Sequence, residues 1–354
     1  MYDINLNDYP RLPGETDDSP RILRAVDDCC DGVLYIPRGV YEIASPILVS
    51  NFCSLLMHKS AVLRAVREMN FVIEWDGGKQ YDDLIVYDKN GEIFDDNNLF
   101  ISGGDIDGAG LASCLRIGGY HHFTLKDITL HNGRKYGLCN SGNHGYELIA
   151  TNVYAKCTVS GLSGNIGIYG DMCDSHYTDC VVVDYTTGIE MRGSSNRLTR
   201  CHVWGGIIKP RTGFTQKEWC DLYRRRKYGV DVYDQKAGND WATDNLPEML
   251  VDSCCFRIHG ISNVLTGCYG DTGKTAFEIQ NTTTMDSCGS FNNFRFGMAG
   301  DLAINHKGGD LYIMNCDFRK CTPTSELYRG DASRLHVMNT RTDGYEFPGA
   351  INKL

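Results

Sequence analysis

Several features that would place this chain in a common class are missing from its sequence. No run of apolar residues approaches the roughly 18 that a membrane span needs, and no Pro/Ser-rich linker or block of like charge interrupts the 354 residues. Residues 1–8 are polar and do not resemble a secretory signal. The only basic run is 224–227, and the net charge is −10, which argues against a nucleic-acid partner. These absences predict one domain over residues 1–354, a cytoplasmic location and no membrane contact.

The 16 cysteines lack the spacing of a zinc site. No Cys-x-x-Cys pair occurs, and the two close pairs, 29–30 and 254–255, are directly adjacent. Most cysteines are flanked by apolar residues, and a free cysteine packs as a small hydrophobic side chain. We therefore predict reduced cysteines in the core, no metal site and no cofactor.

Five of these cysteines mark a repeat. Each stands at the end of a short strand-like segment, and successive cysteines of this set are 21, 67, 20 and 28 residues apart. The five are Cys180, Cys201, Cys268, Cys288 and Cys316. A period of about 20–30 residues with strand-like phrases indicates one coil per repeat, stacked into a solenoid.

The residue before each cysteine is predicted to form a bend. Asn and Asp suit a bend because their side chains bond the nearby backbone, and stacked copies can also bond one another. The aligned bend positions are Asp127, Asn152, Asp179, Arg200, Gly267, Ser287, Asn315 and Asn339. Asp179 therefore has two interpretations. It is either a structural residue in a ladder, a stack of bend side chains that bond one another from coil to coil, or a functional acid.

Residues 17–30 predict a helix, with Ser19 as its N-cap and Pro20 at its first helical position. One face would be apolar and would cover the open end of the solenoid. That face consists of Ile22, Ala25, Val26 and Cys29. Residues 32–43 predict a strand, a turn at 37–39 and a second strand.

Three consecutive segments resemble the opening of pectin-lyase-like right-handed β-helix proteins, with polygalacturonases as the nearer type. They are the stretch from Asp8 to Ser19, the predicted helix, and the sequence VLYIPRGVY at 33–41. The resemblance implies an all-β fold: a single-stranded right-handed parallel β-helix with an N-terminal capping helix. It implies no single reaction, because polygalacturonases, pectate lyases, epimerases, fructan-processing enzymes and phage tailspikes share that fold. Arg257-Ile-His259 resembles one fragment of the polygalacturonase catalytic set, but the ordered set is absent.

Side chains alternate along a strand, so the phrases that begin at Gly167, Gly188 and Gly229 sort into inward and outward positions. Ile168, Ile189, Val230 and Phe277 should point inward. The outward set is Tyr169, Asp171, Glu190, Arg192, Asp231, Tyr233, Glu278 and Gln280. Carboxylates on neighbouring coils would lie about 4.8 Å apart, near the spacing that glycosidases use. Crowding of like charges would raise the pKa of one of them and make it a proton donor.

The long gap between Cys201 and Cys254 predicts an inserted loop at 205–246 over the binding face. His202, Trp204 and Trp241 lie in or beside it, and aromatic rings stack on sugars. With Tyr169, Asp171, His176, Arg192 and Glu278, they are the predicted substrate-binding residues.

The segment 178–191 places Asp179 eleven residues before Glu190. This spacing resembles the Asp/Glu pair of the inulin fructotransferase and difructose-anhydride hydrolase family, and the resemblance implies an acid/base pair and a homotrimer. The sequence thus predicts an enzyme that cleaves or rearranges a glycosidic bond of an oligosaccharide. Glu190 would be the general acid/base, and Asp179 or Asp231 its partner. Two alternatives are a lyase or epimerase acting on uronates, with Ca²⁺ in the case of a lyase, and a non-catalytic glycan-binding protein.

Overall fold

The computed structural model describes residues 2–50, 52–77, 86–87, 93–94, 99–142, 145–159, 162, 164–204, 253–271, 273–291, 302–320, 326–342 and 347. The chain divides into two compact units. Unit 1 contains residues 1–156 and 168–180, and unit 2 contains 157–167 and 181–354. The prediction of a single domain stays a prediction, and the predicted insertion at 205–246 lies outside the described residues.

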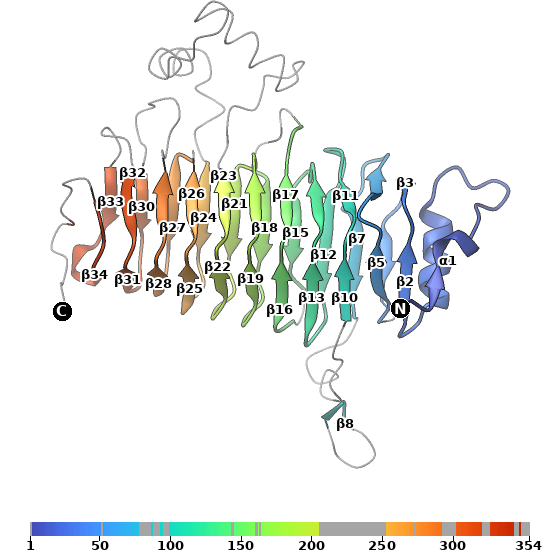
Figure 1. Ribbon diagram of the computed structural model, residues 1–354, viewed down its shortest axis with the longest axis horizontal. Coiled ribbons are helices and arrows are strands. Elements are labelled where there is room, and N and C mark those ends of the chain that lie inside the picture. Colours follow the sequence, from blue (N-terminus) through green and yellow to red (C-terminus); the bar gives the residue numbers. More distant parts are fainter. Residues whose placement is uncertain are drawn as a thin grey trace, which may run out of the picture. The chain divides into compact units, whose positions relative to one another are not determined.

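Unit 1 is built from strands of three parallel sheets, and most of its coils contribute one strand to each sheet (Figure 1). Sheet A has the order β1 (Ile4–Asn5), β2 (Val33–Ile36), β5 (Ser54–Met57), β10 (Leu99–Ser102), β13 (Phe123–Lys126), β16 (Leu148–Thr151) and β19 (His176–Thr178). Sheet B has the order β3 (Gly39–Ile43), β6 (Ala61–Ala65), β11 (Asp105–Asp107), β14 (Thr129–His131) and β17 (Tyr154–Lys156). Sheet C has the order β4 (Ile47–Val49), β7 (Phe71–Asp76), β12 (Ser113–Gly118), β15 (Tyr136–Asn140) and β18 (Ile166–Gly170), of which residues 168–170 belong to unit 1. A separate antiparallel pair joins β8 (Val86–Tyr87) and β9 (Ile93–Phe94).

Unit 2 repeats the three-sheet arrangement. Sheet A consists of β22 (Arg197–Thr199), β25 (Asn263–Thr266), β28 (Thr283–Asp286), β31 (Leu311–Met314) and β34 (Leu335–Met338). Sheet B consists of β20 (Val181–Val183), β23 (His202–Trp204), β26 (Tyr269–Asp271), β29 (Gly289–Phe291) and β32 (Asp317–Lys320). Sheet C consists of β21 (Thr187–Met191), β24 (Cys254–Ile258), β27 (Thr275–Ile279), β30 (Leu302–His306) and β33 (Glu326–Gly330). Two 3₁₀ turns, η1 (Leu6–Asp8) in unit 1 and η3 (Ala332–Arg334) in unit 2, complete the described elements.

Helix α1 (Ser19–Asp28) packs against β1 and β4 at the first coil of unit 1, as the sequence predicts (Figure 1). Its predicted apolar face is buried, because Ile22, Ala25, Val26 and Cys29 are at most 2% exposed. The predicted N-cap is wrong by one residue, because Asp18 holds that position. Ser19 lies inside the helix, and its hydroxyl accepts hydrogen bonds from the backbone N–H groups of residues 44 and 45. Among the described residues, no helix has the length and apolar character needed to cross a membrane.

The predicted bends are confirmed, because all eight positions have left-handed backbone conformations with φ between 47° and 63°. Their side chains also bond between coils, as the stacked arrangement requires. Asn152 donates from Nδ2 to Asp127 Oδ1 at 2.8 Å, and Asn339 donates to Asn315 Oδ1 at 2.9 Å. Bends in αL favour Asn and Asp, which tolerate that conformation better than other side chains with a Cβ.

The repeated cysteines point into the core, as predicted, and each of the five is at most 1% exposed. In unit 2 two of these thiols donate to a backbone carbonyl of the preceding coil: Cys268 to Leu198 at 3.3 Å, and Cys288 to Leu265 at 3.3 Å. The inward prediction also holds for Ile168, Ile189 and Phe277, each 0% exposed, whereas Val230 lies outside the described residues. All 14 described cysteines are free thiols.

In a thiol-labelling experiment on the folded protein, we expect Cys30 to react much faster than Cys268 or Cys288. Cys30 is exposed, whereas the other two are buried, and burial raises the pKa of both thiols well above its ordinary value. Little thiolate would therefore be available at either buried position. Alkylation followed by peptide mass mapping, before and after denaturation, measures the difference. Equal labelling of Cys30 and Cys268 in the folded state would contradict the inward assignment.

Candidate functional site

The outer face of sheet C in unit 2 carries a row of charged and polar side chains at one register position. The strand pairing places Glu190 beside Arg257, and Arg257 beside Glu278. Asn305 and Arg329 continue the same row. Because neighbouring strands lie about 4.8 Å apart, this order separates the two carboxylates by a cation. We call these side chains, together with Arg192, His259, Gln280 and Lys307 just beyond the strand ends, the charged row.

Glu190 is a buried carboxylate surrounded by two guanidinium groups and an imidazole. It is 2% exposed and accepts a hydrogen bond from Arg192 Nε at 2.8 Å. Arg257 Nη1 lies 3.3 Å from its Oε2, and His259 Nε2 lies 3.4 Å from its Oε1. A buried charge is tolerated only where partners replace its lost hydration, and these side chains supply them.

Glu278 repeats this arrangement on β27. Lys307 Nζ lies 2.8 Å from Oε2 of Glu278, and Gln280 donates to Oε1 at 3.0 Å. Arg257 Nε lies 3.2 Å from Oε1 of the same carboxylate. Arg257 therefore bridges Glu190 and Glu278, and the three side chains form one connected network.

Both carboxylates are ionised at neutral pH. Burial alone would raise the pKa of Glu190, but the close contact with His259, the hydrogen bond from Arg192 and the charge of Arg257 lower it to about 2. Burial also acts to raise the pKa of Glu278, yet the contacts with Lys307 and Gln280 and the charge of Arg257 bring it below its ordinary value. The expected rise of one carboxylate pKa is therefore wrong for these two residues. The sequence suggested that carboxylates would lie side by side, but Arg257 stands between Glu190 and Glu278. A neighbouring cation lowers the pKa of a carboxylate, whereas a neighbouring carboxylate would raise it.

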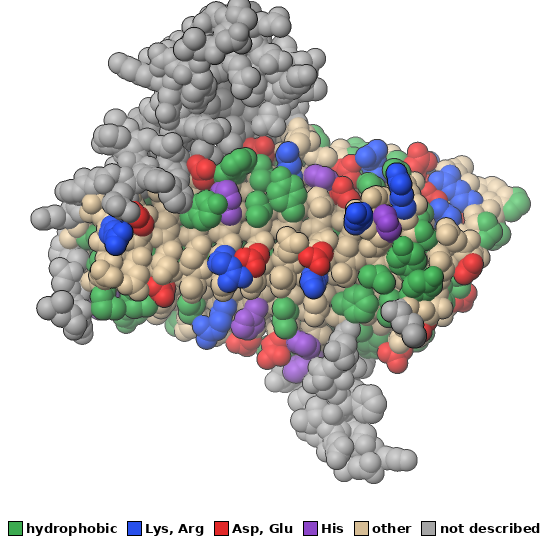
Figure 2. All heavy atoms as spheres, viewed as in Figure 1, with side chains coloured by type: hydrophobic (Ala, Val, Ile, Leu, Met, Phe, Trp, Pro, Cys, Tyr) green, Lys and Arg blue, Asp and Glu red, His purple; other side chains and the backbone are tan. Residues whose placement is uncertain are grey.

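The basic side chains of the charged row differ in their access to solvent. The side chains of Arg192 and Lys307 are 52% and 48% exposed, whereas those of Arg257 and His259 are 26% and 22% exposed. Among the described residues, the two carboxylates of Glu190 and Glu278 contact three permanent cations. These cations are Arg192, Arg257 and Lys307, so this group of five side chains carries a surplus of positive charge. The exposed cations provide places where an anionic group of a ligand can bind. Elsewhere, acidic and basic side chains also lie beside one another on the molecular face shown in Figure 2.

The structure brings together only part of the predicted site. Glu190, Arg192 and Glu278 meet on sheet C of unit 2. His202 and Trp204 lie on β23 of sheet B, and His176 lies on β19 of sheet A in unit 1. In unit 1, Tyr169 on β18 packs against Tyr136, with ring centroids 5.2 Å apart, and the exposed Asp171 follows that strand. Asp231 and Trp241 lie outside the described residues.

Asp179 lies at the left-handed bend between β19 and β20, not on a strand of sheet C. Its φ of 55° matches the other bend residues, so it occupies the position of a ladder residue. Its catalytic role stays a prediction.

Sequence reasoning missed Arg257, His259 and Lys307 as site residues. The fragment Arg257-Ile-His259 was a usable signal, because two side chains with one residue between them point to the same side of a strand. Lys307 carried no comparable signal. In the described part of the chain, no group of three or more His, Cys, Asp or Glu side chains is placed to hold a metal ion. The Ca²⁺ site that the lyase alternative implies stays a prediction.

No protein-family model matches the sequence, and no curated protein matches it. The structure is similar to Geobacillus virus E2 ORF18, with a TM-score of 0.54 and 12% identity, over 96% of this chain and 62% of that chain. It is also similar to the A-module of the Azotobacter vinelandii mannuronan C-5 epimerase AlgE4, with a TM-score of 0.58 and 10% identity, over 96% and 95% of the two chains. A third similar structure is the endo-xylogalacturonan hydrolase from Aspergillus tubingensis, with a TM-score of 0.53 and 12% identity, over 96% and 93%.

These likenesses and the three parallel sheets identify the fold. The chain has the fold of a right-handed parallel β-helix with an N-terminal capping helix, as the sequence predicts. It spans less than two thirds of the viral protein, 62%, and nearly the full length of the epimerase module and the hydrolase.

Proposed function

We propose that this protein is a carbohydrate-active enzyme that binds a uronate-containing oligosaccharide at the charged row. The observation that carries the proposal is the surplus of cations around two ionised carboxylates, with Arg192 and Lys307 half-exposed. A guanidinium binds a carboxylate with two parallel hydrogen bonds, which suits the acid group of a uronate. Two of the similar structures are named for enzymes that act on uronans, mannuronan and xylogalacturonan.

The proposed reaction begins with removal of the proton on the carbon next to the sugar carboxylate. Arg192 would bind that carboxylate and stabilise the negative charge that develops on it. His259 would accept the proton, since its Nε2 lies 3.4 Å from Oε1 of Glu190 and the negative charge of that carboxylate stabilises the imidazolium that forms. A proton held on Nε2 leaves the lone pair on Nδ1 as the base.

The electron pair left on that carbon has two outcomes. It can form a double bond while the bond to the neighbouring sugar oxygen breaks; that oxygen takes the proton from His259 and leaves as a hydroxyl group, which is elimination and gives an unsaturated product. It can instead take a proton from water on the opposite face of the ring, while His259 returns its own proton to solvent, which is epimerisation and leaves the chain intact. Neither outcome requires a protonated carboxyl group, and both described carboxylates of the charged row have lowered pKa values.

Hydrolysis or transfer of a glycosidic bond, the first prediction from the sequence, is the second candidate. The likeness to the xylogalacturonan hydrolase supports it. It requires a proton donor beyond the charged row, and Asp179 and Asp231 are the predicted residues that remain for that role. The homotrimer and the cytoplasmic location also stay predictions.

We expect Arg192→Gln to lower kcat/KM on uronate oligosaccharides about 100-fold, because it removes the group that stabilises the developing charge. Lys307→Gln should raise KM more than it lowers kcat, since it weakens binding at the edge of the row. The assay compares galacturonate and mannuronate oligosaccharides with fructans and difructose anhydrides. Ultraviolet absorbance detects unsaturated products, and NMR detects epimers and hydrolysis products.

Arg64→Gln is the matched control, because Arg64 also pairs with a carboxylate, Asp107 at 3.0 Å, but on sheet B of unit 1. It should leave turnover unchanged. Turnover of neutral sugars alone, or equal effects of Arg192→Gln and Arg64→Gln, would refute the proposal. Sugar binding without any product would favour the non-catalytic alternative.

A further inference from the structure

Sheet B of unit 2 presents an exposed tryptophan on a rigid strand. Trp204 on β23 is 40% exposed, although most large apolar side chains of the described coils are buried. Its neighbour in register on β26 is Asp271. An indole ring beside a carboxylate offers both an apolar surface and a hydrogen-bond acceptor, the combination that a sugar ring with its hydroxyl groups requires.

One ring contacts Trp204, and a second ring supports the first. The ring of His202 stacks on that of Tyr269, with centroids 3.9 Å apart and planes 22° apart. Trp204 meets His202 edge-on, with centroids 5.6 Å apart and planes at 85°. Burial lowers the pKa of His202 to about 4, so the ring is neutral at physiological pH. The support beneath Trp204 is therefore an uncharged aromatic stack, which fixes the indole before any ligand binds.

His202 has an unsatisfied polar atom at this position. Its Nδ1 lies 3.0 Å from the hydroxyl of Tyr269, but its Nε2 is buried and has no hydrogen-bond partner in the described part of the chain. A neutral imidazole carries a proton on one nitrogen and a lone pair on the other. The nitrogen is buried, so a ligand on the outer face does not reach it. The preference for a neutral sugar comes from Asp271, whose negative carboxylate beside Trp204 repels an acidic ring.

We propose that Trp204 and Asp271 form a binding subsite for a neutral sugar ring on sheet B, separate from the charged row on sheet C. The apolar face of the sugar would stack on the indole, and its hydroxyl groups would donate to the carboxylate of Asp271. The proposal does not depend on the reaction at the charged row. It assigns to the protein a second, non-catalytic contact with a glycan.

Isothermal titration calorimetry with cello-, xylo-, manno- and fructo-oligosaccharides tests the subsite. At least one of these sugars should bind the wild type, Trp204→Ala should weaken that binding about tenfold or more, and Trp204→Phe should retain part of it. Tyr312→Ala is the matched control, because Tyr312 is 38% exposed and stacks on His336 at 4.6 Å, but on sheet A. It should bind as the wild type does. Circular dichroism confirms that each variant is folded.

The double variant Arg192→Gln/Lys307→Gln separates the two proposals, since it should keep Trp204-dependent binding even where uronate turnover is lost. The subsite is refuted if none of the four sugars binds in a Trp204-dependent way. It is also refuted if Tyr312→Ala weakens binding equally. A change of oligomeric state in Trp204→Ala, measured by light scattering, without loss of sugar binding would show that the exposed indole contacts another copy of the chain.

Discussion

Replacement of Glu190 by Gln is expected to reduce turnover at least about 100-fold and to destabilise unit 2. The carboxylate is 2% exposed and holds Arg192, Arg257 and His259 through contacts of 2.8–3.4 Å. Gln has the same shape but no charge, so the partly buried Arg257 would lose one of its two anionic partners. Removal of one partner from a buried ion pair typically costs about 3–5 kcal/mol, and a small displacement of a reacting group can cost about 100-fold in rate.

The pH dependence of stability provides a second measurement on the same variant. The pKa of Glu190 is about 2 in the folded protein against an ordinary value of 4.5, so its ionised form contributes about 3 kcal/mol to folding at neutral pH. Because the folded pKa is the lower one, this contribution is present above the unfolded value and is lost as the pH falls from about 5 to about 2. Denaturant unfolding across that range should show a smaller loss in Glu190→Gln than in the wild type.

Glu326→Gln is the control for both measurements, because Glu326 pairs with Arg329 on the same sheet but its side chain is 44% exposed. An exposed pair contributes roughly 0–1 kcal/mol, so little should change. Glu190→Asp should restore the charge and part of the activity. If Glu190→Gln retained wild-type turnover, the charged row would not be the active site.

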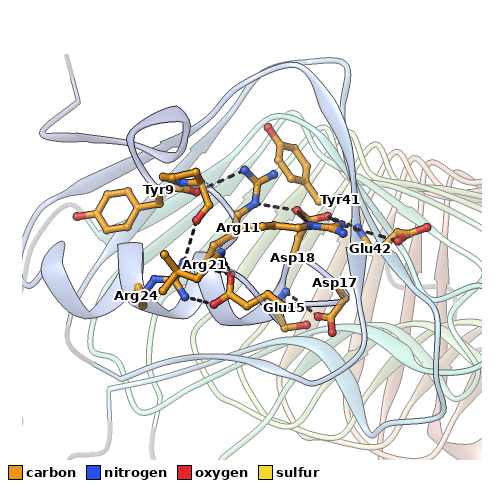
Figure 3. A network of polar contacts seen from close by, with 12 residues as sticks. Tyr9, Arg11, Glu15, Asp17, Asp18, Arg21, Arg24, Tyr41 and Glu42 are labelled. Atoms are coloured by element: carbon orange, nitrogen blue, oxygen red, sulfur yellow. Dashed lines mark hydrogen bonds and ion pairs between the residues drawn. The ribbon is translucent and has the colours of Figure 1, made fainter.

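Replacement of Asp18 by Asn is expected to loosen the N-terminal cap and to lower the stability of unit 1 by about 3 kcal/mol. Asp18 is 3% exposed and receives hydrogen bonds from Arg11 at 2.6 and 3.0 Å, from Arg21 at 2.7 Å and from the backbone N–H of Glu42 at 2.8 Å (Figure 3). It thus ties the segment before α1 and the helix itself to β3. Burial acts to raise its pKa, but Arg11, the Glu42 N–H and Arg21 lower it, so acid should weaken the cap.

Thermal unfolding and hydrogen exchange of the α1 amides measure this effect, and light scattering detects aggregation through the first coil once the helix detaches. The comparison variant is Asp28→Asn, since Asp28 lies at the exposed end of α1 and accepts one hydrogen bond from Tyr9 at 2.8 Å. Its effect should stay below about 1 kcal/mol. If α1 exchanged at the same rate in Asp18→Asn and in the wild type, the cap would not depend on this network.

The interior of the coils was predictable because it depends on local alternation. Side chains on a strand point to opposite faces, so one cysteine per coil set the inward and outward positions of the residues around it. The bends followed from the same alignment, even at Arg200 and Ser287, whose side chains are not typical of a left-handed backbone. The N-cap was misplaced because Ser19 bonds the backbone of residues 44 and 45, a tertiary contact that local pattern cannot show.

The sequence by itself thus determined the solenoid, its capping helix and the outward position of Glu190, since each depends on residues close together in the chain. The tertiary structure alone decided what lies beside Glu190. Its neighbour in register, Arg257, is 67 residues away in the sequence. This separation is much longer than one coil, so the repeat period does not predict that the two residues are paired. Stacking of the coils brings that cation to within 3.3 Å and, with Arg192 and His259, lowers the carboxylate pKa that crowding was expected to raise. The sign of a pKa shift depends on the charges nearest in space, and these are set by the packing of coils rather than by the order of residues.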